Sequence, residues 1–370
     1  MRRRSSASSD SAALVRRAGS VAIPGFFMLV FLAGGFLLTL LNPATFRPPH
    51  NAEVLSGEWT ASYQAAFEDE LPLRQTAVES WTLLTYLAFA EGRPGVLVGD
   101  GGWLFTTEEF APNPDADTSL SVSLSEVEQV KSELDALGVE LVIALVPAKA
   151  RLYADNLGRY TLPAAARERY ESARGHLSAL GVTVPDLLTP LQEAMAESDV
   201  FLRTDTHWTP FGARVVAETL ASAVGSLDTD TFETRELGTT RHHGDLLGFI
   251  PLGSFQERFG PEPDTLRQLE TVQTSERGGG LFDEVEIPVA LVGTSYSAHR
   301  AWNFAGALRQ ALGADVLNVA EEGAGPLAPM ERYLSGGRFA ETPPELIIWE
   351  VPERYLTATQ EPDAEAGQLP

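Results

Sequence analysis

The chain has no cysteine among its 370 residues, and lysine occurs only at Lys131 and Lys149. Without cysteine there is no disulfide framework, no thiolate nucleophile and no cysteine-ligated metal or iron–sulfur site. Basic side chains are also scarce, because 27 of them stand against 51 acidic ones and leave a net charge of −24. Nucleic-acid affinity depends on Lys and Arg that displace counterions from phosphates. The composition therefore excludes thiol chemistry and argues against a nucleic-acid partner.

Charge is unevenly distributed along the chain. Residues 1–20 contain five arginines and one aspartate, a local charge of +4, so the rest of the chain carries −28. An uncharged stretch at residues 21–41 follows directly, and as a helix it would cross the ~30 Å hydrocarbon core of a bilayer. The next residues, LNPATFRPPH, lack the cleavage pattern of a signal peptide. We therefore predict an uncleaved single-pass anchor in the cytoplasmic (inner) membrane, with a basic cytoplasmic tail and the remainder in the periplasm or extracellular space.

Hydrophobic periodicity divides the remainder of the chain. It predicts an approach segment at residues 42–98 with one helix over 64–91, and an α/β domain at residues 99–358. Within that domain a loop-rich insertion with short strands is expected at 226–283, and residues 359–370 are expected to form a flexible tail. Buried strands that alternate with helices predict a parallel sheet covered on both faces. The strands are expected at residues 140–147, 287–293, 315–320 and 345–351.

Two helix starts are indicated by capping residues. Thr209 followed by Pro210 is the pattern of an N-cap and a first helical residue. Ser123 with Glu126 has the spacing of a capping box, which predicts a second helix that ends at Gly138.

Three segments place reactive residues just after strands, where sites form in open α/β sheets. In VALVGTSYS, Ser295 precedes a helix and is either a nucleophile or an ordinary N-cap. In RTDTHWTPFGA, the spacing of Asp205 and His207 points both side chains to one side of an extended backbone. This pair is either an oriented general base or a loop histidine beside an Asx turn. In NVAEEGAGP, Gly323 or Gly325 offers a backbone N–H to a developing oxyanion.

Other residues have both a functional and a structural interpretation. His299 is an alternative base, or a rim or core residue. The segment HHGD at 242–245 invites a metal site, but adjacent histidines in a strand face opposite ways, so a wet loop is favoured and no metal is expected. Lys149 and Arg151 are either ligands of an anionic sugar or solvated surface residues. Trp208 either stacks on a sugar ring or packs at a helix start.

The segments GTSYS, DTHWTPFGA, GDGGWLF, VPAKARLY and IIWEVPERYL together resemble the alginate O-acetyltransferase family of the AlgJ/AlgX type, over roughly residues 95–356. The resemblance implies an SGNH-hydrolase-like three-layer α/β sandwich with a central parallel sheet. It also implies a Ser–His–Asp triad that carries an acyl group, usually acetyl, onto hydroxyls of an exported polysaccharide. Ser295 then matches the nucleophile, His207 the general base and Asp205 the orienting acid. Tyr296 is a further candidate for substrate binding.

The sequence departs from the common SGNH pattern. The acid–base block precedes the serine block, which resembles a circularly permuted order, and Thr294 stands where an aspartate is common. The last strand ends in WEVPER, where such enzymes place an oxyanion-hole asparagine. The expected oxyanion donors are therefore the backbone N–H of Ser295, then that of Gly323 or Gly325, and then the side chain of Arg354.

The expected function is that of a membrane-anchored O-acetyltransferase that uses a serine acyl-enzyme and needs no cofactor. The chain has no Walker-type or dinucleotide-type phosphate loop. The resemblance implies that a multi-span membrane O-acyltransferase supplies the acyl group. Two alternatives stay open at this point: a carbohydrate esterase of the same fold, and a non-catalytic polysaccharide-binding envelope protein.

Overall fold

The structure, a computed structural model, describes residues 26, 28–42, 44, 57–111, 114–275 and 287–357. The chain divides into two compact units. The smaller unit contains Met1–Leu84 and Leu252–Ser254, and the larger contains Thr85–Pro251 and Phe255–Pro370. The two tails expected at 1–20 and 359–370 lie outside the described residues.

The membrane-spanning helix predicted over residues 21–41 is wrong. In the described part of the chain, no helix is both long and apolar enough to cross a membrane. Residues 21–25 lie outside the description. The predicted single-pass location in the inner membrane depended on this helix and is therefore not supported.

The approach segment contains two helices instead of the single helix predicted over 64–91. Helix α2 spans Glu58–Asp69 and helix α3 spans Arg74–Phe89. Pro72 lies in the turn between them. Proline lacks the N–H that a helix needs and disfavours helical geometry in the residue before it, so the helical pattern is interrupted here.

A four-stranded sheet in the order β3-β8-β6-β7 lies at the centre of the larger unit. Its strands are β3 (Glu140–Val146), β6 (Val289–Val292), β7 (Val316–Asn318) and β8 (Leu346–Pro352), and all three strand pairs are parallel. The prediction of a central parallel sheet is therefore confirmed. Because the strands are parallel, their carboxyl ends meet at one edge, and the catalytic candidates follow that edge.

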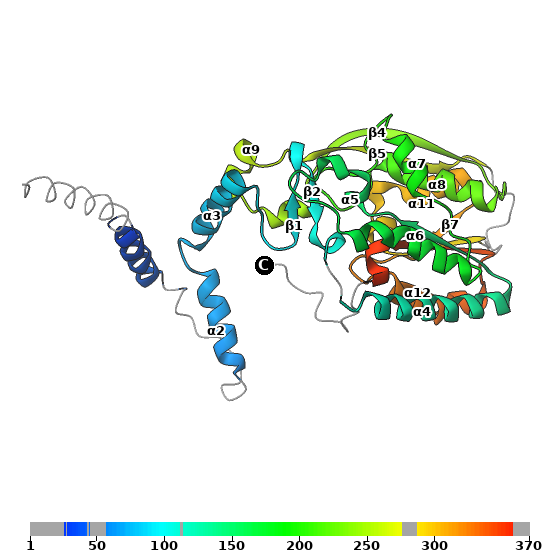
Figure 1. Cartoon of the computed structure of the whole chain (residues 1–370), viewed down its shortest axis with the longest axis horizontal. Coiled ribbons are helices and arrows are strands. Elements are labelled where there is room, and N and C mark those ends of the chain that lie inside the picture. The colour runs from blue at the N-terminus through cyan, green and yellow to red at the C-terminus, as the bar shows by residue number, and fades with distance from the viewer. Residues whose placement is uncertain are drawn as a thin grey trace, which may run out of the picture. The chain divides into compact units, whose positions relative to one another are not determined.

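Helices cover both faces of the sheet (Figure 1). Alternate strand residues belong to two separate cores, with Val142 and Ala144 in one and Leu141 and Ile143 in the other. This alternation follows from the two-residue period of a strand. One face carries α7 (Leu188–Ala194), α8 (Pro210–Val224) and α11 (Phe304–Leu312); the other carries α4 (Ala116–Leu137), α6 (Ala164–Ala179), α12 (Leu327–Leu334) and α13 (Gly337–Glu341). The result is a three-layer sandwich.

The two capping predictions had different outcomes. Helix α8 begins as expected, because the Thr209 hydroxyl accepts the N–H of Gly212 and Pro210 is the first helical residue. Helix α4 begins at Ala116, so the start predicted at Ser123 is wrong. Ser123 lies inside that helix, buried, and its hydroxyl donates to the carbonyl of Leu356 at 3.3 Å.

The insertion at 226–283 contains a long antiparallel ribbon instead of short strands. Strand β4 (Phe232–His242) pairs with β5 (Asp264–Gln273), with an irregularity between Glu236 and Gly238. A smaller hairpin pairs β1 (Val96–Val98) with β2 (Leu104–Thr106). The short helices are α5 (Lys149–Leu152), α9 (Gln256–Phe259) and α10 (Ser295–Ala298). The end of β4 at His242 brings this ribbon to the candidate site, as described below.

Candidate active site

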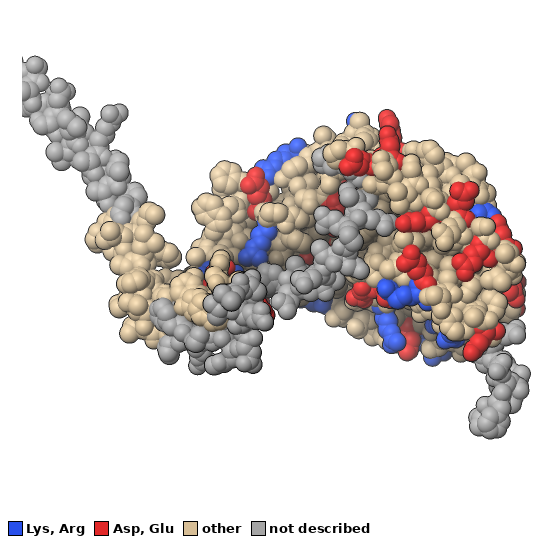
Figure 2. All heavy atoms as spheres, turned by 90° about the horizontal axis from the view of Figure 1, so that it is seen from below, with Lys and Arg blue, Asp and Glu red and all other residues tan. Residues whose placement is uncertain are grey.

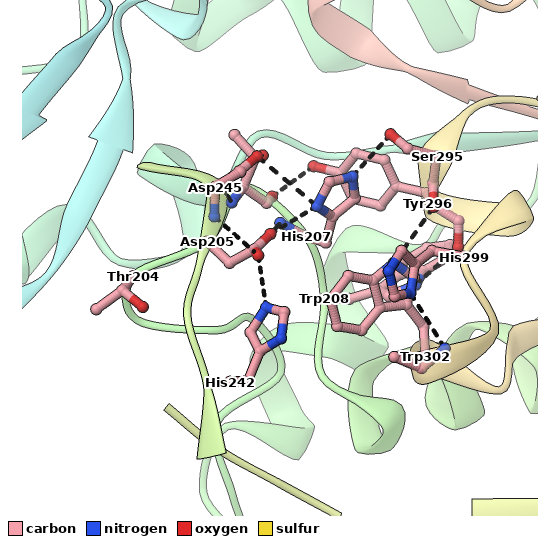
Figure 3. A network of polar contacts seen from close by, with 12 residues as sticks. Thr204, Asp205, His207, Trp208, His242, Asp245, Ser295, Tyr296, His299 and Trp302 are labelled. Carbon is pink, nitrogen blue, oxygen red and sulfur yellow. Dashed lines mark hydrogen bonds and ion pairs between the residues drawn. The ribbon is translucent and has the colours of Figure 1, made fainter. Parts of the chain in front are cut away.

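A chain of hydrogen bonds joins Ser295, His207 and Asp205 (Figure 3). Nε2 of His207 lies 2.7 Å from Oγ of Ser295, and Nδ1 lies 2.6 Å from Oδ1 of Asp205. With the proton on Nδ1 donated to the carboxylate, Nε2 is an acceptor for the serine hydroxyl. This arrangement is the one in which an imidazole can take a proton from a serine while a carboxylate holds its tautomer.

Ser295 stands at the turn from β6 into α10. The Thr294 hydroxyl caps this short helix by accepting the N–H of Tyr296 at 3.4 Å. Below the turn, the carboxylate of Glu350 accepts the N–H and hydroxyl of Thr294 at 2.8 and 3.0 Å, and the hydroxyl of Ser297 at 3.0 Å. Glu350 is fully buried on the central strand β8, and this burial raises its pKa. It therefore braces the serine turn at the position where the sequence suggested an oxyanion-hole residue.

Gly293 is required by the close approach of Glu350. A Cβ at this glycine would lie 2.5 Å from Oε2 and 2.8 Å from Cβ of Glu350. Because three hydrogen bonds hold that carboxylate, we expect Gly293→Ala to shift the serine turn and to lower the free energy of unfolding by about 1–3 kcal/mol. Thermal and urea unfolding measure this effect. Gly175→Ala on exposed helix surface, where an added Cβ meets nothing within 4 Å, is the control. An unchanged stability of Gly293→Ala would contradict the prediction.

Two acidic side chains accept hydrogen bonds from the backbone N–H groups of the loop that carries Asp205 and His207. The N–H groups of Arg203 and Thr204 each donate to Asp264 at 2.9 Å. The N–H of Thr206 donates to Asp245 at 2.9 Å. Sequence analysis missed Asp264 and considered Asp245 only as part of the HHGD segment, because both acids reach this loop only through the folding of the β4–β5 ribbon and the segment between its strands.

Lys149 donates hydrogen bonds to backbone carbonyls of the same loop. Its buried ammonium donates to the carbonyls of Leu104, Arg203 and Asp205 at 2.6, 3.0 and 2.9 Å. It also lies 5.2 Å from the ring centroids of both Trp103 and Phe105. Burial lowers the pKa of Lys149 to about 8. Because three carbonyls take its three donors and only 1% of the residue is exposed, Lys149 is not positioned to bind a sugar.

Asp205 bonds to a second imidazole. Its Oδ2 lies 2.7 Å from Nε2 of His242 and accepts the N–H of Asp245 at 3.2 Å. Burial alone would raise the pKa of Asp205, but hydrogen bonds from His207 and His242 outweigh it and hold the pKa well below its usual range. Sequence analysis treated His242 only as part of a metal motif or a wet loop. Its place at the end of a strand was the one local signal of a role near the site.

Aromatic side chains enclose the acid–base pair. The Trp302 ring stacks on that of His207 with centroids 5.2 Å apart, and its Nε1 donates to the carbonyl of Ser295 at 3.2 Å. Tyr296 and Trp208 are 1% and 0% exposed, and Nε1 of Trp208 donates to the carbonyl of Tyr296. The hydroxyl of Tyr296 donates to the carbonyl of Thr206 at 2.7 Å. Tyr296 and Trp208 therefore pack beneath the site, and neither ring presents a face to a substrate.

Two arginines proposed for substrate or oxyanion contacts have structural partners. The guanidinium of Arg151 pairs with Glu353 at 3.1 Å and donates to two carbonyls of α6. That of Arg354 pairs with Glu108 at 2.8 Å and lies against the Tyr296 ring, 5.7 Å from its centroid. Both guanidinium groups are therefore occupied by these neighbours.

The remaining candidates are His299 and the two glycines, Gly323 and Gly325. His299 is the C-cap of α10, and its N–H donates to the carbonyl of Ser295 at 3.2 Å. Its ring stacks on that of Trp302 and its Nδ1 accepts the N–H of Ala301 at 3.2 Å, whereas the serine hydroxyl contacts His207. Gly323 and Gly325 both have positive φ, at 72° and 65°. Their loop is tied to the strand end before the serine, because the N–H of Glu321 donates to the carbonyl of Gly293 at 3.1 Å. These glycines stay candidates for an oxyanion contact.

Potential metal-ligand atoms of Asp205, His207 and Asp245 lie within 4.8 Å of one another. Hydrogen bonds already engage all three: Asp205 with His207, and Asp245 with the N–H and hydroxyl of Thr206. A cation between them would have to break the 2.6 Å bond that orients the imidazole. The donor set is therefore that of an acid–base pair, and we assign no metal to it.

The fold and this site can be placed among known proteins. Residues 96–353 match the family described as "SGNH hydrolase-like domain, acetyltransferase AlgX". The chain belongs to this family. The match confirms the family resemblance read from the sequence, and with it the SGNH-like α/β fold around a central parallel sheet.

Individual relatives agree with this assignment. A protein of Azotobacter vinelandii named "Probable alginate O-acetylase AlgJ" is 43% identical over 328 residues, which are 86% of this chain and 84% of that protein. The "Alginate biosynthesis protein AlgX" of the same organism is 33% identical over 278 residues, 69% of this chain and 54% of that protein. Among solved structures, "O-Acetyltransferase Domain of Pseudomonas putida AlgJ" matches with a TM-score of 0.67 and 41% identity, over 75% of this chain and 96% of that one.

Proposed function

We propose that this protein is an O-acetyltransferase that carries an acetyl group on Ser295 and passes it to a hydroxyl of an alginate-type polysaccharide. The observation that carries the proposal is the 2.7 Å contact between Nε2 of His207 and Oγ of Ser295, with Asp205 on the opposite ring nitrogen. Membership of the acetyltransferase family and the names of the AlgJ relatives support the choice of acyl group and acceptor.

The first half-reaction acylates the serine. His207 takes the proton of the Ser295 hydroxyl while Oγ attacks the carbonyl carbon of the acetyl donor, and Asp205 stabilises the imidazolium that forms. The backbone N–H of Ser295 is the first proposed donor to the oxyanion, and the Gly323–Gly325 loop supplies the second. When the tetrahedral intermediate collapses, the bond to the leaving group breaks and His207 returns the proton to that group.

The second half-reaction transfers the acyl group. A polysaccharide hydroxyl gives its proton to His207 and attacks the acetyl carbon, and Ser295 leaves with the proton that His207 returns. Two successive displacements on one serine predict ping-pong kinetics. Water competes for the same carbon, so transfer requires that the sugar hydroxyl occupies the position next to His207 in place of water.

The proposed source of the acetyl group is a multi-span membrane O-acyltransferase. The chain has no Walker-type or dinucleotide-type phosphate loop that would hold a nucleotide-based donor, which supports a donor protein. The acceptor is anionic, as is this protein. Figure 2 shows acidic side chains spread over the surface of the larger unit, in line with the −28 carried by residues 21–370. We therefore expect acceptor binding to strengthen as salt screens the repulsion between the two.

Transfer is tested on the full-length protein with p-nitrophenyl acetate as donor and alginate oligosaccharides as acceptor. We expect one acetyl group on the peptide that contains Ser295 and acetylated oligosaccharide in the mass spectrum. Oligosaccharides should also speed the loss of the acetyl-enzyme. Release of acetate alone, with no acetylated sugar at any acceptor concentration, would contradict the transferase and indicate an esterase. No acetylation of the protein at all would contradict the acyl-enzyme.

A further inference from the structure

The Asp205 carboxylate is held by four hydrogen-bond donors. On Oδ1 they are the N–H of His207 at 3.0 Å and its Nδ1 at 2.6 Å. On Oδ2 they are Nε2 of His242 at 2.7 Å and the N–H of Asp245 at 3.2 Å. The carboxylate is 3% exposed, so nearly all its contacts are to protein. His242 supplies the shorter of the two contacts on Oδ2.

His242 reaches this carboxylate from the β4–β5 ribbon, far from Asp205 in sequence. It is the last residue of β4 and pairs in register with Asp264, the acid that binds the N–H groups of Arg203 and Thr204. Its ring also meets the ring of Trp302 edge-on, with centroids 5.4 Å apart and planes at 84°. Figure 3 shows His242 and His207 directed toward the two oxygens of Asp205. The second imidazole is therefore held by a hydrogen bond on one side and a ring contact on the other.

We propose that His242 is a positioning residue for the acid–base pair, which fixes the plane of the Asp205 carboxylate and keeps Oδ1 on Nδ1 of His207. The inference rests on the proposed function of Ser295. A carboxylate bonded at one oxygen can rotate about its Cβ–Cγ bond, whereas short contacts at both oxygens define its plane. Because this plane sets the direction of the His207 ring, the position of Nε2 at the serine depends on His242.

His242 also affects how strongly Asp205 accepts the hydrogen bond from Nδ1 of His207. The groups that face it are Asp205, Asp264 across the ladder, Asp245 at the next turn and the uncharged Trp302 ring. The hydrogen bond to Asp205 raises the pKa of His242. A donor on Oδ2 makes Asp205 a weaker acceptor for His207. Without that donor, the carboxylate accepts the hydrogen bond from Nδ1 of His207 more strongly, and its plane is no longer fixed from the Oδ2 side.

Two substitutions separate positioning from a merely structural role. His242→Leu keeps bulk and removes the donor, whereas His242→Gln keeps an N–H donor without an imidazole. We expect His242→Leu to slow acetylation of Ser295 about tenfold to a hundredfold at pH 7. His242→Gln should stay within about threefold of the unmodified protein. His243→Leu, at the exposed neighbouring residue, is the control.

The outcomes distinguish this inference from the proposed function. If the unmodified protein forms acetyl-Ser295 and His242→Leu forms it at the same rate, only the positioning role is overturned. A His242→Gln variant as slow as His242→Leu overturns it as well. If the unmodified protein never becomes acetylated, the proposed function itself fails.

A measurement on the unmodified protein covers the case in which His242→Leu does not fold. In a ¹⁵N-histidine-labelled sample, the Nδ1–H proton signal of His207 should shift as His242 titrates, because the two rings share one carboxylate. A signal that stays constant through the titration of His242 would overturn the inference.

Discussion

Replacing Ser295 by alanine is expected to abolish acetyl transfer, with a loss of about 10⁶-fold in the rate constant of the chemical step. The hydroxyl is the only proposed attachment point of the acetyl group, and His207 has no other proton to take at this position. The substitution removes one partially exposed contact, so the fold should be retained. Intact-mass spectrometry after incubation with p-nitrophenyl acetate measures the acetyl-enzyme, and analysis of the oligosaccharide measures transfer.

Ser222→Ala is the matched control for this experiment. Ser222 is exposed on α8 and its hydroxyl donates only to the carbonyl of Glu218, one turn earlier in the same helix. We expect its acetylation and transfer rates to equal those of the unmodified protein. Acetylated oligosaccharide formed by Ser295→Ala at an undiminished rate would rule out the acyl-enzyme route and favour a non-catalytic role for this serine.

Replacing Lys149 by methionine is expected to lower the free energy of unfolding by about 3 kcal/mol or more and to reduce acetylation sharply. Methionine fills the space of the lysine stem but leaves the carbonyls of Leu104, Arg203 and Asp205 without their donor. It also removes the positive charge next to buried Glu109 and the acids around the loop. Urea unfolding measures the stability, and the acetyl-enzyme assay at a temperature where the variant is folded measures the activity.

The chain offers one matched control, because Lys131 is its only other lysine. Lys131 forms an exposed pair with Asp135 one turn away on α4, and such pairs contribute roughly 0.3–0.5 kcal/mol. We expect Lys131→Met to change neither stability nor acetylation beyond that amount. If Lys149→Met were as stable and as active as Lys131→Met, the role of Lys149 in holding the loop of Asp205 and His207 would be disproved.

Local sequence patterns were sufficient to predict the parallel sheet and to select three candidate residues that the structure brings within hydrogen-bonding distance. A strand buried on both faces is a continuous apolar run, and Ser295 stood out because it follows one at the edge where sites form. Asp205 and His207 were also expected just after a strand, but the structure has only an isolated bridge between Phe201 and Trp208 there. The cap at Thr209 and Pro210 is likewise a contact between residues close in sequence. Predictions of this kind succeed because the atoms that decide them are neighbours along the chain.

Local patterns failed where partners come from distant segments. Ser123 matched a capping box, but its hydroxyl bonds to Leu356 from the middle of a helix. Lys149 was expected to be a sugar ligand or a solvated surface residue, yet it is buried. Of the two alternatives for Trp208, its burial favours packing at the helix start over stacking on a sugar. The predicted membrane helix also failed, since the described residues contain no helix that is long and apolar enough to cross a membrane.

The absence of cysteine by itself therefore excluded thiol chemistry, and the motifs identified the family and three candidate side chains. Only the tertiary structure decided how those side chains are held. Asp205 is bonded by His242, the serine turn is braced by Glu350, and the loop between them is held by Lys149. These contacts join residues far apart in the chain, and their distances depend on the packing of the sheet, the ribbon and the loop together.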